Sequence, residues 1–138
     1  MKKFIPLLIP VFIFFVTFFI SGYFSAINTD PHHDGIVLKP AIDVVNGKML
    51  FRDTFTQYGA LTTLIQAFAI KIFGEYLITI KLLTAFFYGL VAVLIYFIWS
   101  RFLSKKLAIF SLLIWLLLAP YLSVVFLPWS SVYALFFQ

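Results

Sequence analysis

Three long stretches of the chain are apolar and carry no charged side chain. They cover residues 4–24, 82–100 and 107–138. A bilayer core about 30 Å thick is crossed by roughly 20 helical residues, so the first two stretches each predict one transmembrane helix. The third is long enough for a crossing over about 107–127, a turn, and the start of a fourth helix.

Two prolines divide the third stretch. Pro120 falls inside the predicted crossing and predicts a kink there, and the segment Pro128-Trp129-Ser130-Ser131 predicts a turn at the membrane surface. Residues 132–138 are apolar again but too short to span a bilayer. We therefore expect the chain to be the front of a longer protein. The first stretch exceeds a signal-peptide core, and only the weak cleavage-site candidate "SGYFSAIN" follows it, so an uncleaved helix is expected.

The segment 26–81, between the first two predicted spans, contains two helical patterns. The first lies in "IVLKPAIDVVNGK", where Pro40 would fit in the first turn and Gly47 would end the helix. The second is "LTTLIQAFAIKIFG", which Gly74 would end. Its apolar stripe consists of Leu61, Leu64, Ile65, Phe68, Ile72 and Phe73. Both helices are predicted to lie in the plane of the membrane interface.

The amino-acid composition also indicates a membrane protein. Hydrophobic residues make up 64% of the 138 positions and charged residues only 11%, against about 25% charged in ordinary soluble domains. A chain of this size could not bury so much apolar surface in water, so lipid must solvate much of it. The prediction is one all-α integral membrane domain over residues 1–138. The absence of cysteine excludes disulfides and cysteine metal sites.

The net charge of +5 comes from one set of basic residues that has no acidic neighbours. These residues are Lys2, Lys3, Arg101, Lys105 and Lys106, and the predicted spans bring all of them to one side. In residues 26–81, five basic residues balance five acidic ones. By the positive-inside rule the amino terminus is cytoplasmic and the first loop is extracytoplasmic. The net positive charge therefore indicates which side of the membrane each loop occupies. It is not interpreted as a nucleic-acid-binding surface, and no nucleic-acid partner is predicted.

The hexapeptide "DPHHDG" gathers the ionisable chemistry at the start of that loop. Asp34 precedes a helical pattern and could simply cap it, while Asp30 before Pro31 is typical of a turn. Two adjacent imidazoles beside a carboxylate leave a divalent cation as an alternative, but neighbouring histidines diverge too far to hold one ion, so no metal site is assigned. Later in the loop, Lys39, Lys48 and Lys81 are interpreted as contacts to lipid headgroups.

The order of motifs "HHDG…NGKMLFRDTFTQYGAL…KIFGEYLITIKLLTAF" resembles the amino-terminal part of polytopic GT-C-type glycosyltransferases. The nearest are family 39-like bacterial enzymes related to protein O-mannosyltransferases and lipid A aminoarabinose transferases. The matching positions are Asp34, Gly47, Phe51-Arg52-Asp53, Gly59-Ala60-Leu61 and Phe73-Gly74. Two positions depart from that pattern: Asp34 stands alone where the family has an acidic pair, and Ala60 replaces a proline.

The resemblance implies sugar transfer, at the outer face of a bacterial inner membrane, from a polyprenyl-phosphate-linked donor to a hydroxyl of a lipid, glycan or protein acceptor. It implies Asp34 as the general base that takes the acceptor's proton. His33 would orient Asp34 or contact phosphate, and Arg52 has the planar fork that suits phosphate oxygens. The resemblance also implies Asp53, beside Arg52, as a substrate-binding residue, although Arg52 and Asp53 could equally pin the loop. No cofactor is expected.

Two alternatives to an active transferase segment follow from the same residues. The chain could be a small non-catalytic membrane protein, such as a transporter subunit or an assembly factor, or an inactive truncated remnant. A transporter places ionisable residues within its spans, and none of the three apolar stretches contains one.

Overall fold

The computed structural model describes residues 5–27, 29–122 and 130–137. Within these ranges the fold is all-helical, as predicted, and consists of six helices. They are α1 (Ile5–Ile27), α2 (Pro31–Val45), α3 (Ala60–Phe73), α4 (Leu77–Phe102), α5 (Lys105–Leu122) and α6 (Ser130–Phe137). Two of them, α1 over Leu8–Ile27 and α4, are long and apolar enough to cross a membrane.

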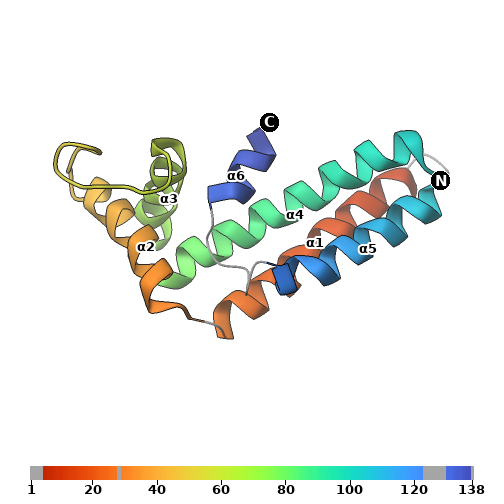
Figure 1. The fold of residues 1–138 in the computed structure, drawn as a ribbon, viewed down its shortest axis with the longest axis horizontal. Helices are drawn as coiled ribbons and strands as arrows, with labels where there is room; N and C mark the ends of the chain where they lie inside the picture. The colour runs from red at the N-terminus through yellow and green to blue at the C-terminus, as the bar shows by residue number, and fades with distance from the viewer. Residues whose placement is uncertain (1–4, 28, 123–129, 138) are drawn as a thin grey trace.

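Helix α4 is the centre of the structure. Helix α1 runs antiparallel along most of it, α5 packs beside it, and α6 and α3 contact it as well. The start of α1, the end of α4 and the start of α5 lie at one end of the molecule, and the α2–α3 pair lies at the other (Figure 1). This arrangement separates Arg101, Lys105 and Lys106 from the ionisable residues of the segment between α1 and α4.

The contact between α1 and α4 depends on small residues. A Cβ atom at Gly89 would lie 2.8 Å from the Phe14 ring, so glycine is required for this close approach. Gly22 of α1 also faces α4. A Cβ atom at Gly22 would lie 3.4 Å from the Leu82 side chain and 3.9 Å from Ala85, which are ordinary contact distances. Close backbone approach through small residues is the usual mode of helix packing in membranes.

Polar side chains face the interior of the bundle and large apolar side chains face outward. Thr17 and Ser21 of α1 are fully buried, while Phe12 and Phe19 of the same helix are 70% and 65% exposed. The described residues give neither buried hydroxyl a hydrogen-bond partner. Helix α3 repeats the pattern: its apolar stripe is mostly exposed, and Thr62, Thr63 and Gln66 are buried.

Most predicted helix bounds hold to within a few residues, with three differences. Helix α2 begins at Pro31, so "DPHHDG" starts the helix and Pro40 lies inside it, where it cannot donate to the Ile36 carbonyl. The prediction that Pro40 occupies the first turn is therefore wrong. Helix α4 begins at Leu77, five residues before the predicted span, because the pattern stopped at the charge of Lys81.

The third difference is at the carboxyl end, where α5 continues through Pro120 to Leu122. The last part of the predicted crossing (123–127) and the Pro128-Trp129 part of the predicted turn lie outside the described residues. Ser130 and Ser131, predicted as part of the turn, instead begin α6, so that part of the prediction is wrong. The fourth helix predicted from residue 132 is confirmed, two residues longer at its start. This helix docks on α4 through a hydrogen bond of 2.9 Å between the Tyr133 and Thr84 hydroxyls and a ring contact between Tyr133 and Phe87.

Candidate functional site

The first turn of α2 is fixed by two reciprocal side-chain caps. Asp30 is the N-cap, and its Oδ1 accepts hydrogen bonds from the backbone N–H groups of His32 (3.0 Å) and His33 (3.2 Å). In return, the Asp30 backbone N–H donates to Asp34 Oδ2 at 3.2 Å. Pro31 occupies the first helical position, where a missing N–H costs nothing. The interpretation of Asp34 as the N-cap is wrong, since Asp30 has that role.

Asp34 is instead one half of a buried ion pair. Its Oδ2 lies 3.0 Å from Lys81 Nζ, and both side chains are almost completely buried. The Lys81 ammonium also donates to the Ser25 carbonyl at 3.1 Å. That carbonyl belongs to the last turn of α1, where helix carbonyls lack helical partners and a positive charge is favoured. The ends of α1, α2 and α4 therefore meet at Lys81, and we call Ser25, Asp34 and Lys81 the three-helix junction.

The second carboxylate oxygen of Asp34, Oδ1, is also buried. Among the residues that the structure describes, nothing donates a hydrogen bond to Asp34 Oδ1. A buried acceptor without a donor costs roughly 1–3 kcal/mol, and more when it belongs to a charged group. Such an oxygen is suited to accept a proton or hydrogen bond from a hydroxyl that reaches it. It is the chemical feature that most distinguishes Asp34 from a purely structural carboxylate.

His33 lies against Asp30. Its Nδ1 is 2.9 Å from Asp30 Oδ2, and this hydrogen bond is the main reason that the pKa of Asp30 lies below its ordinary value. His32 is exposed and its ring meets the His33 ring edge-on. In the described ranges no group of three or more His, Asp or Glu side chains is arranged to hold a metal ion.

Arg52 and Asp53 lie in the turn that follows α2, and they pair with each other. The guanidinium donates from Nε to Asp53 Oδ1 at 2.9 Å and from Nη2 to Asp53 Oδ2 at 3.0 Å, and this lowers the pKa of Asp53. Asp53 Oδ2 also accepts from the Met49 backbone N–H. The turn follows the carboxyl end of α2, and from Asp34 to Val45 the helix rises by about 16 Å. The structure therefore does not bring Arg52 and Asp53 to Asp34.

Asp43 anchors this turn to α2. Its carboxylate pairs with Lys39 and with Lys48 (2.8 Å), and it accepts a hydrogen bond from the Thr54 hydroxyl at 2.9 Å. Gly47 ends the helix with φ +84°. The N–H groups of Gly47 and Lys48 bond back to Val44 and Asp43, as in a Schellman motif. Lys39 and Lys48 bind the Asp43 carboxylate but keep largely exposed side chains, so their contact with lipid headgroups stays a prediction. For Lys81, which is buried against Asp34, that prediction is wrong.

Hydrogen bonds from Lys39, and then from Lys48, hold the pKa of Asp43 far below its usual 3.8. A lowered pKa stabilises the fold above pH 3.8, and this contribution disappears as the pH falls through the folded-state pKa. We expect Asp43→Asn to raise amide hydrogen exchange in residues 46–56 several-fold at neutral pH. As the pH falls below 3.8, the wild-type rates should approach those of the variant. Equal rates at neutral pH would show that Asp43 does not anchor the turn.

Sequence reasoning missed Lys81 as a site residue. It was interpreted as a headgroup contact just outside the second apolar stretch, whereas it lies inside α4 and turns toward α1 and α2. A signal was present: a single lysine in the first turns of an otherwise apolar helix requires a counter-charge. The sequence alone did not indicate which of the five acidic residues supplies it.

The chain matches no protein-family model, no curated protein and no solved structure. The GT-C resemblance and the roles it implies for His33, Asp34, Arg52 and Asp53 therefore stay predictions.

Proposed function

We propose that the chain is the amino-terminal membrane segment of a GT-C-type glycosyltransferase. It would transfer a sugar from a polyprenyl-phosphate-linked donor to an acceptor hydroxyl at the outer face of the membrane. The observation that carries this proposal is Oδ1 of Asp34, which is buried and has no hydrogen-bond partner among the described residues. Lys81 and the Asp30 N–H both bind the other oxygen, Oδ2, and so fix the orientation of the carboxylate. Because Oδ1 is buried, an acceptor hydroxyl has to enter the three-helix junction to reach it. General-base catalysis needs such an acceptor within hydrogen-bond reach of the hydroxyl.

The proposal places α1, α4 and α5 across the bilayer, with α2 and α3 at its outer surface. Phenylalanine and leucine side chains cover the outward faces of these helices, while hydroxyl and charged groups lie between them. In water such a surface would be a large exposed apolar patch, but in lipid it is the ordinary exterior. The exposed apolar stripe of α3 fits a helix that lies in the interface, with Lys71 and Glu75 near its end.

This placement predicts the topology. Arg101 is in the last turn of α4, and Lys105 and Lys106 begin α5. These two helix ends lie at the end of the molecule opposite the α2–α3 pair (Figure 1). A reporter fused after Arg101 should therefore read cytoplasmic, and one inserted within residues 45–60 should read extracytoplasmic. Alkaline phosphatase and fluorescent-protein fusions measure the two sides independently. The reverse pattern would put Asp34 in the cytoplasm and end the proposal of outer-face transfer.

The transfer itself is tested with the chain in membranes, together with any continuation of its reading frame. Radiolabelled polyprenyl-phosphate hexose or aminopentose is supplied, and label is followed into lipid, glycan and protein fractions. Transfer above that in matched membranes without the protein is the expected result. No transfer from either donor, with the protein present and folded, would contradict the proposal.

A second candidate function is supported by the ion pair itself. In a non-catalytic membrane protein, Asp34 and Lys81 would serve only to hold α2 against α1 and α4. Breaking a buried pair is costly even where the pair does no chemistry. The two candidates differ in what they predict for a variant in which both members of the pair are replaced together. A purely structural pair can be replaced without loss of function, whereas a general base cannot.

A further inference from the structure

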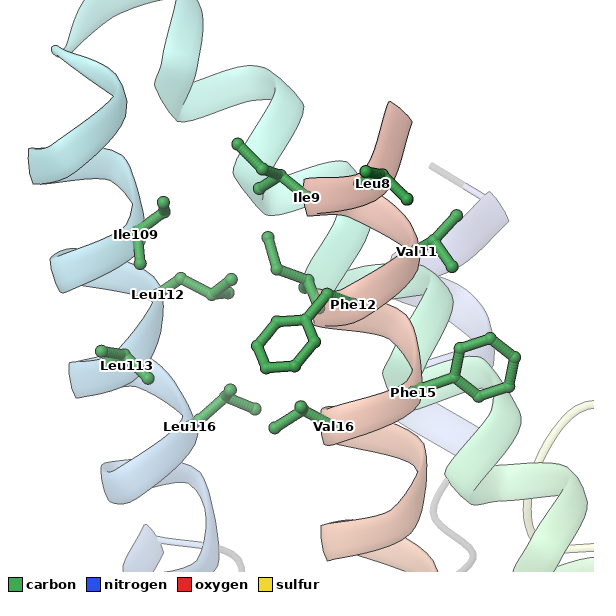
Figure 2. Close-up of a pocket in the computed structure, with 11 residues that line it drawn as sticks. Leu8, Ile9, Val11, Phe12, Phe15, Val16, Ile109, Leu112, Leu113 and Leu116 are labelled. Atoms are coloured by element: carbon green, nitrogen blue, oxygen red, sulfur yellow. The ribbon is translucent and has the colours of Figure 1, made fainter. Parts of the chain in front are cut away.

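An apolar groove runs between α1 and α5 at the end of the bundle opposite Asp34. Both helices pack on α4 but leave space between themselves, with a volume of about 650 Å³. Phe12 and Val16 of α1 point toward Leu112 and Leu116 of α5 across this space (Figure 2). All the residues that line the groove are apolar. Its volume is within the roughly 300–1,000 Å³ typical of small-ligand sites.

Three cations lie at the end of the bundle where this groove begins. Arg101 is in the last turn of α4, and Lys105 and Lys106 begin α5. All three side chains are exposed, and in the described part of the chain none forms an ion pair or a hydrogen bond. Every acidic residue of the chain lies between positions 30 and 75, at the opposite end. The charge of this end is therefore uncompensated within the chain.

The two lysines share a helix face with the groove. In an α-helix, residues three, four and seven positions apart lie on one side. Ile109, the lining residue nearest the start of α5, is four positions after Lys105 and three after Lys106. Leu112 and Leu113 follow Lys105 and Lys106, respectively, by seven positions and also line the groove. A ligand lying in the groove would therefore extend directly toward the two ammonium groups.

We infer that this groove, with Arg101, Lys105 and Lys106, is a binding site for an anionic phospholipid of the cytoplasmic leaflet. The apolar groove takes an acyl chain, and the cations contact the headgroup phosphate. A further apolar helix would fill the groove but leave the three charges without partners. A phospholipid with a net negative charge fits both the groove and the cations. Its acyl chain is apolar, and each basic residue at the membrane surface attracts its anionic headgroup. The inference rests on the membrane placement proposed above and not on glycosyl transfer.

The test uses the purified chain reconstituted in vesicles with spin-labelled lipids. The fraction of motionally restricted label is compared for phosphatidylglycerol and phosphatidylcholine. We expect phosphatidylglycerol to associate about tenfold more strongly, and this preference to fall at high salt, because exposed charges are screened. Inorganic phosphate at millimolar concentration should not displace the lipid. An equal association of both lipids, or full displacement by phosphate, would overturn the inference.

Two variants separate the headgroup contact from the groove. The triple variant R101Q/K105Q/K106Q should lower the preference to less than about twofold, whereas Lys71→Gln, at the opposite end, should leave it unchanged. Val16→Trp should fill the groove and reduce restricted lipid of both kinds, and Ile20→Trp on the same helix, outside the groove, serves as its control. Circular dichroism verifies that each variant is folded. A preference that survives the triple variant, or restricted lipid unchanged in Val16→Trp, would contradict the site.

Discussion

Lys81→Met is expected to lower the free energy of unfolding by about 3–5 kcal/mol, because it leaves the carboxylate of Asp34 buried without its counter-charge. The two charged atoms are 3.0 Å apart and both side chains are only a few per cent exposed, so water cannot compensate for the lost partner. Unfolding of the purified chain in mixed micelles, followed by circular dichroism, measures the change. Lys71→Met, at an exposed lysine of α3 that forms no ion pair with the described residues, is the matched control and should change little.

The double variant Asp34→Asn/Lys81→Met should recover most of this loss. Replacing both members of a buried pair by neutral side chains is often close to neutral in stability. The asparagine side-chain carbonyl introduced by Asp34→Asn can still accept the hydrogen bond from the Asp30 N–H, so the first turn of α2 keeps its reciprocal caps. If the double variant were as unstable as Lys81→Met, the two side chains would not act as a pair.

The same double variant gives the second prediction, which concerns activity. If Asp34 is the general base, the double variant should fold normally and still lose about 10²-fold or more in transfer rate. Asp34→Asn alone cannot decide the question, because it also leaves the Lys81 ammonium buried without its counter-charge. The rate is measured in membranes with matched amounts of folded protein and a radiolabelled polyprenyl-phosphate sugar as donor.

Glu75→Gln is the control for this activity measurement. It removes a carboxylate from the exposed segment between α3 and α4, which has no proposed role in transfer, and should leave the transfer rate within a few-fold of wild type. Full activity in the double variant would assign Asp34 and Lys81 to structure alone. The non-catalytic candidate would then stand only if the wild-type chain also failed to transfer sugar.

The helices could be predicted from sequence because apolar periodicity and end signals agree along most of the chain. Gly47 and Gly74 end α2 and α3 as expected, since both adopt positive φ. The start of α2 was missed because its N-cap, Asp30, lies before a proline and was interpreted as a turn. Asp-Pro fits both a turn and the first positions of a helix, and local sequence does not distinguish them.

The candidate site was predicted only in part, because its geometry depends on contacts distant in sequence. The "DPHHDG" motif drew attention to Asp34, but Asp34 pairs with Lys81 of α4, and Lys81 in turn binds the Ser25 carbonyl of α1. No local pattern specifies such a pairing. Arg52 and Asp53 were grouped with Asp34 through the order of motifs along the chain. The rise of α2 separates them, which sequence order does not reveal.

The three-helix junction also sets an order of assembly during synthesis. The Ser25 carbonyl and Asp34 leave the ribosome before Lys81, which follows Ser25 by 56 positions. In the proposed membrane placement, the carboxylate has no counter-ion until α4 is inserted, and it is stable only where water reaches it. Helix α2 would therefore stay at the membrane surface and close onto the bundle after α4 is inserted. In that interval the segment between α1 and α4 is open to surface proteases, and its protection reports that insertion is complete.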